Sequence, residues 1–197
     1  MGLSIHYDGK LKNGSDLKEL LNEVAETCKT FDWYHEIFND EFPRSNSEKI
    51  LRKHEVYGMA FTPPDCETVF LCFEPDGTMK NPLWKMLEDD SDDELKEITT
   101  TSVKTQSAGI ETHKQIINLF KYLEKKYFSE FSMYDESGFW DHGDLEKLRE
   151  KMVITERTVK LIEERLNTKR LEGEKLEDFV VRAYNNKRNQ RQFESGI

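Results

Sequence analysis

The residues best suited to chemistry are four side chains in one short stretch, Asp135, Glu136, Asp141 and His142. Carboxylate oxygens and an imidazole nitrogen are common ligands of divalent metal ions, and a bound metal can activate water for hydrolysis. The stretch therefore suggests a small metal-dependent hydrolase as one candidate function. A loop without a metal is the competing interpretation, because surface loops are often rich in aspartate and histidine.

Two large aromatic residues, Phe139 and Trp140, lie in the same stretch between Gly138 and Gly143. Glycines on both sides let the chain turn sharply with little strain. Trp140 either closes the end of the core or is partly exposed and anchors a partner. The binding surface predicted on the second interpretation consists of Phe139, Trp140, Asp141 and His142.

Other motifs of known chemistry are absent from the sequence. It has no glycine-rich phosphate loop, no GxSxG elbow and no HExxH pair, and none of its five histidines is paired with another at metal-ligand spacing. His113 falls in the first turns of a predicted helix, where we expect it to be exposed. Ser15 begins an SxxK tetrapeptide, but its position favours a helix N-cap. The sequence thus predicts no catalytic residue and no cofactor.

The charge balance limits the class of partner. The chain carries 39 Asp and Glu against 29 Lys and Arg, a net charge of -10, which argues against general nucleic-acid binding. The acidic run from Glu88 to Glu94 is either a solvated loop or a mimic of phosphate that occupies a basic groove. The leading prediction is a non-catalytic, acidic protein-interaction module, an inhibitor or immunity-type antagonist of a basic protein partner.

Cysteine usage and hydropathy indicate the compartment. The three cysteines, Cys28, Cys66 and Cys72, are widely spaced, and the last two flank a predicted strand about 20 Å long, beyond disulfide reach. Free thiols, no apolar run of membrane-spanning length and no signal-peptide pattern predict a soluble cytoplasmic protein without a membrane partner.

The elements that must position these residues follow from hydrophobic periodicity. Alternating or β-branched segments predict strands at residues 3–7, 33–38, 56–62, 68–73, 98–105 and 131–135, with Asp8-Gly9 as a turn after the first. Apolar residues at helical spacing predict helices after Asp16 and around Glu111, and a polar connection is expected at residues 44–53. The predicted fold class is α+β, a mostly antiparallel sheet covered by two helices and followed by a helical C-terminal arm.

The chain changes character after residue 143, so we predict an α+β body at residues 1–143 and a helical arm with a short polar tail at residues 144–197. Asp144 is the expected cap of the arm. An a/d heptad pattern runs through Leu145, Leu148, Met152, Thr155, Val159, Ile162 and Leu166. Thr155 either continues one long helix or caps a second one. The apolar stripe is expected to be mostly buried, either against the body or in a homodimer through the C-terminal helix.

Three segments carry a resemblance to a known group of proteins. They are residues 57–68, Lys104-Thr105-Gln106 and residues 135–140. Together they resemble an uncharacterised bacterial family of small standalone soluble proteins with no assigned activity, over roughly residues 3–150. The resemblance implies a bacterial cytoplasmic protein and supplies no activity, cofactor or catalytic residue.

Overall fold

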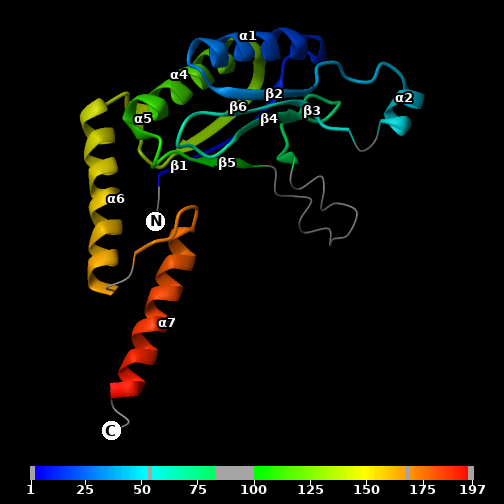
Figure 1. Ribbon diagram of the computed structural model, residues 1–197. Helices are drawn as coiled ribbons and strands as arrows, with labels where there is room; N and C mark the ends of the chain where they lie inside the picture. Colours follow the sequence, from blue (N-terminus) through cyan, green and yellow to red (C-terminus); the bar gives the residue numbers. More distant parts are fainter. Residues whose placement is uncertain (1–2, 53–54, 83–99, 167–168, 195–197) are drawn as a thin grey trace.

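The computed structural model describes residues 3–52, 55–82, 100–166 and 169–194, and it has the predicted α+β architecture. Antiparallel strands form the centre, helices α1 (Leu17–Thr30) and α4 (Gly109–Tyr127) cover one face of them, and two long C-terminal helices extend away on the other side (Figure 1). The acidic run at 88–94, His54 and residues 98–99 of the predicted fifth strand lie outside the described residues.

The first sheet has the strand order β5-β1-β6. It consists of β1 (Ser4–Leu11), β5 (Thr101–Lys104) and β6 (Phe128–Asp135), with β1 antiparallel to both neighbours. The predicted turn at Asp8-Gly9 is wrong, because both residues pair with β6 and the strand continues to Leu11. A Cβ atom on residue 9 would lie 2.8 Å from the carbonyl oxygen of Glu130. Gly9 thus permits close strand pairing here and does not mark a turn.

The second sheet has the order β2-β3-β4, with β2 (Tyr34–Asn39), β3 (Tyr57–Thr62) and β4 (Val69–Phe73). Isolated bridges join it to the first sheet, Lys10 with Thr78 and Phe73 with Met79. The buried Tyr7 hydroxyl adds a further link. It donates to the carbonyl of Phe70 at 3.0 Å and accepts from the Phe70 amide at 3.1 Å.

The core lies between the sheets and the two covering helices. Helix α1 buries the predicted stripe, and α4 buries its own together with His113. The buried residues of the two helical stripes include Leu17, Leu20, Leu21, Val24, Cys28, Ile116, Ile117, Phe120 and Leu123. Ser15 does not cap α1 as predicted, since it lies in a 3-10 turn (Gly14–Asp16) and Asp16 takes the N-cap position without a side-chain cap bond.

Two short helices form where the sequence predicted loops. Helix α2 (Asn46–Leu51) starts at Ser45, whose Oγ accepts from the Glu48 amide at 3.2 Å, while the Glu48 carboxylate accepts from the Arg44 amide. This resembles the reciprocal capping-box arrangement and was readable from the Ser45-x-x-Glu48 spacing. Helix α5 (Phe139–His142) is one turn between Gly138 and Gly143, both in the left-handed conformation.

The C-terminal arm contains α6 (Leu145–Leu166) and α7 (Leu176–Glu194). Asp144 caps α6 as predicted, since its Oδ1 accepts from the amides of Glu146 and Lys147. Helix α6 is continuous through Thr155, whose hydroxyl donates to the carbonyl of Lys151 within the helix. The alternative of two helices is therefore wrong.

The heptad stripe of α6 is buried only in part. Leu148 and Met152 join the main core, and Val159 packs against a small second core of Leu176, Phe179 and Ala183 on α7. Leu145, in contrast, is 37% exposed, and the side chains of Ile162 and Leu166 lie outside the described residues.

Candidate functional site

A buried polar network lies where the end of β6 meets α4. His113 on α4 is fully buried, and its Nε2 lies 3.3 Å from Asp135 Oδ1 and 3.0 Å from Ser137 Oγ. The other ring nitrogen, Nδ1, lies 2.7 Å from the hydroxyl of Thr105, just after β5. One imidazole therefore joins three segments that are distant in the sequence.

The network contains a serine, a histidine and an aspartate, the residue types of a nucleophilic triad. In a triad the carboxylate and the serine contact opposite nitrogens of the imidazole. Here Asp135 and Ser137 both contact Nε2, and the Ser137 hydroxyl donates to Asp135 Oδ2 at 2.6 Å while it accepts from the Phe139 amide at 3.1 Å. Ser137 is 3% exposed. The arrangement orients a turn and does not present a nucleophile.

Asp135 is the charged centre of the network. Burial raises its pKa, but hydrogen bonds from His113 and Ser137, together with the charge of His113, outweigh that effect and lower the pKa to about 2. Its carboxylate also accepts the amides of Ser137 and Trp140. A carboxylate with so many donors is held as an anion, and it fixes the start of α5.

The structure separates the four predicted metal ligands. The Asp135 side chain points into the core, whereas Glu136 accepts from the Ser4 amide at 2.8 Å and lies 3.7 Å from His6 Nε2. Asp141 and His142 are exposed on α5. Within the described ranges, which include all four residues, no group of three or more His, Cys, Asp or Glu is arranged to hold a metal ion.

The predicted aromatic binding surface is divided between core and surface. Phe139 is buried in the main core, and Trp140 is half-buried with its ring 5.8 Å from that of Phe131. The ammonium of Lys121 lies 5.4 Å from the centre of the Trp140 ring. Phe139, predicted as part of the binding surface, is therefore a core residue, whereas part of Trp140 is accessible.

Sequence reasoning missed the role of His113. The prediction of an exposed histidine is wrong, because His113 lies on the same stripe as Ile116, Ile117 and Phe120 and faces the core. The spacing of three and four residues before the two isoleucines was the available signal. What the sequence alone did not show was that Asp135, Ser137 and Thr105 would surround the ring.

The cysteines offer no activated nucleophile. All three are free thiols, with Cys28 and Cys72 buried and Cys66 half-buried. Burial raises the pKa of Cys66 to about 12 and that of Cys28 to about 11. A thiol with a raised pKa is protonated at neutral pH and therefore a poor nucleophile.

Exposed apolar side chains, in contrast, are concentrated in two segments. Among the described residues, those at 31–51 and 145–184 include all the large exposed hydrophobic side chains except Tyr122 and Tyr134. The arm contributes Leu145, Val153, Ile154, Leu161, Leu171, Val180, Val181 and Tyr184. Clustering of this kind marks interaction surfaces more often than scattered single residues do.

Comparisons of the chain with protein-family models, curated proteins and solved structures return no match. In the part of the chain that the structure describes, no helix combines the length and the apolar character needed to cross a bilayer.

Proposed function

We propose that the protein is a non-catalytic protein-interaction module whose main binding element is the C-terminal arm, α6 and α7. The observation that carries the proposal is the concentration of exposed apolar side chains on the arm. Ile154 and Leu161 are 60% and 53% exposed on α6, and Val181 and Tyr184 are 60% and 63% exposed on α7. Helices gain most of their stability in proteins from packing, so a partner that covers these side chains would stabilise the arm.

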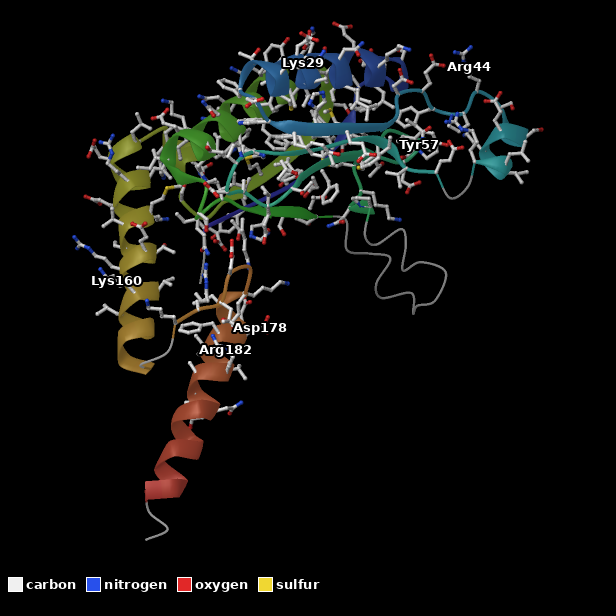
Figure 2. The ribbon with its side chains drawn as sticks, viewed as in Figure 1. Lys29, Arg44, Tyr57, Lys160, Asp178 and Arg182 are labelled. Atoms are coloured by element: carbon white, nitrogen blue, oxygen red, sulfur yellow. The ribbon has the colours of Figure 1, made fainter. Side chains whose placement is uncertain are left out.

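The position of the arm relative to the body also leaves α7 accessible to a partner. It contacts the body through the first half of α6, where Leu148 and Met152 pack, and through an ion pair at the start of α7, where Glu177 lies 3.9 Å from Lys104; α7 also packs on α6. Arg182, labelled on α7 in Figure 2, holds the connection between the helices. Its Nε lies 2.6 Å from Glu174 Oε1, and its Nη2 donates to the carbonyl of Lys169. Figure 1 shows α7 extending away from the sheets.

The charge of the body defines a second feature of the proposed module. Residues 1–143 carry 28 Asp and Glu against 16 Lys and Arg, a net charge of -12. This charge supports an acidic antagonist that approaches a basic protein by electrostatic attraction. The three free thiols support a further part of the proposal, that the protein acts in the reducing cytosol of a bacterium.

The test is affinity capture from cell extract with three forms of the full chain. They are the wild type, an arm variant with Ile154→Asp and Leu161→Asp, and a control with Ile50→Asp and Leu51→Asp on α2, whose side chains are 77% and 84% exposed. We expect a partner that the wild type and the control retain and that the arm variant loses, with circular dichroism unchanged in all three. Equal capture by all three forms would contradict the proposal, as would a stoichiometric metal in the purified protein that His142→Ala removes.

A further inference from the structure

A groove of about 880 Å³ lies between α6 and the segment that leads into α4. Its apolar lining comes from Ile110 on α4 and from Met152, Val153 and Val159 on α6. Among the described residues, the charged side chains that line it are Arg157, Lys160, Arg170 and Glu156. The groove therefore combines an apolar floor with a mainly cationic border.

Two of these cations, Arg157 and Lys160, have no interaction partner among the described residues. Arg157 and Lys160 are exposed, and neither makes a hydrogen bond or an ion pair with another described residue. Figure 2 marks Lys160 on α6. Other cations of the protein are engaged, for example Lys126 with Glu19 and Glu23, and Lys18 with Asp40. Within the described side chains, Arg157 and Lys160 therefore have no partner that would compete with a ligand.

The net charge of the arm is opposite to that of the body. Residues 144–197 carry 13 Lys and Arg against 11 Asp and Glu, a net charge of +2, beside the net -12 of residues 1–143. The start of α4, at Gly109, opens onto the groove, and no side chain caps that helix end. A helix N-terminus carries partial positive charge, which adds to that of the border.

We propose that this groove binds an acidic segment of a partner protein, one that inserts large apolar side chains between α6 and α4 while its carboxylates contact Arg157 and Lys160. The inference rests on the proposed function and names the chemistry that the arm recognises: the basic surface of the partner would face the acidic body, and an acidic segment of the same partner would enter the groove. A volume of about 880 Å³ is at the upper end of ordinary ligand pockets, which is enough for several side chains. The apolar floor supplies affinity, and the cations select the charge of the segment.

A nucleic acid fits these observations less well. A polyanion would place many phosphates beside a body of net charge -12, and the resulting repulsion grows with the length of the strand. A short acidic peptide brings few charges and uses the apolar lining, which phosphates cannot use. The observations therefore favour a peptide segment.

The experiment selects random 16-residue peptides from a display library on the wild-type full chain and measures the affinity of the winners by fluorescence anisotropy. The test variant is Arg157→Glu with Lys160→Glu, and Val153→Asp tests the apolar lining at a position that is 39% exposed. The matched control is Lys49→Glu with Lys125→Glu, because both lysines are exposed and neither ammonium group has a described partner. Thermal melts of all forms establish that folding is unchanged.

We expect winners rich in Asp, Glu and large apolar residues. Their affinity should fall at least tenfold in the Arg157/Lys160 variant and in Val153→Asp, remain unchanged in the lysine control, and weaken as salt increases. Selected peptides that bind the Arg157/Lys160 variant as tightly as the wild type would overturn the groove as the binding site, but not the proposed function. Failure to select any peptide would likewise overturn this inference alone. Loss of the partner in the capture experiment, in contrast, tests the proposed function directly. Equally tight, groove-dependent binding of a 20-nucleotide single strand would overturn the choice of a peptide.

Discussion

His113 and Asp135 lie side by side in the interior, with Nε2 of the histidine 3.3 Å from Oδ1 of the aspartate and both side chains fully buried. Helix α4 supplies one residue and the last position of β6 the other. The Asp135 carboxylate also accepts hydrogen bonds from the Ser137 hydroxyl and the Trp140 amide, so it fixes the turn that leads into α5. Its consequence is a dependence of stability on pH.

We predict that the protein loses stability in acid through Asp135. The folded-state pKa is lowered to about 2, below an unfolded value of about 3.9. The stabilising contribution is therefore present above pH 4, where the unfolded carboxyl is also ionised, and is lost as the pH falls from about 4 to about 2. Its size is roughly 2–3 kcal/mol. Urea denaturation of the wild type and Asp135→Asn at several pH values measures it.

The control for this experiment is Asp141→Asn, since Asp141 is exposed and makes no hydrogen bond or ion pair with another described residue. The gap between wild type and Asp135→Asn should narrow as the pH approaches 2. A gap that stays constant over this range would show that the ionisation of Asp135 does not contribute.

Tyr7→Phe should destabilise the link between the two sheets. The Tyr7 hydroxyl is the hydrogen-bond partner of both the amide and the carbonyl of Phe70. Loss of the hydroxyl leaves the part-buried amide and carbonyl of Phe70 without this hydrogen-bond partner, at a cost of about 1–3 kcal/mol in the free energy of unfolding. Tyr122→Phe is the matched control, because its hydroxyl bonds Glu23 at the surface and its loss should cost well under 1 kcal/mol.

The two aromatic residues of α5 should differ in their contribution to stability. Phe139 is buried, so Phe139→Ala is expected to cost about 3–5 kcal/mol. Trp140 is half-buried against Phe131, so Trp140→Ala should cost less, about 1–3 kcal/mol. Thermal or urea unfolding of both variants gives the comparison. A larger cost at Trp140 would show that its ring is the main closure of the core.

Removal of the α6 cap should weaken the start of the arm. Asp144 Oδ1 accepts two backbone amides, so Asp144→Ala is expected to lower the free energy of unfolding by about 1 kcal/mol. Asp144→Ser should restore most of it, because serine also caps helices. Hydrogen exchange at the first amides of α6 provides a local readout, and unchanged protection in Asp144→Ala would contradict the assigned role.

The sequence by itself determined most of the helices and strands, because hydrophobic periodicity and helix caps are local signals. The apolar spacing after Asp16 and around Ile116 predicted α1 and α4, alternation and turn residues predicted the six strands, and Asp144 predicted the start of α6. These predictions succeeded because periodicity reports which face of an element is buried without reference to its neighbours. The Ser45-x-x-Glu48 spacing shows that one further helix, α2, was also readable.

Only the tertiary structure decided what the chemically distinctive residues do. Gly9 reads as a turn residue until the partner strand β6 shows that its missing Cβ allows close pairing. Asp135 and Glu136 read as neighbours in a metal site until the structure shows that Asp135, the last residue of β6, is buried beside His113, whereas Glu136, in the turn that follows, accepts from the Ser4 amide. His113 acquires its partners from segments 8 to 24 residues away. Contacts of this kind depend on how elements pack, and no local pattern encodes that packing.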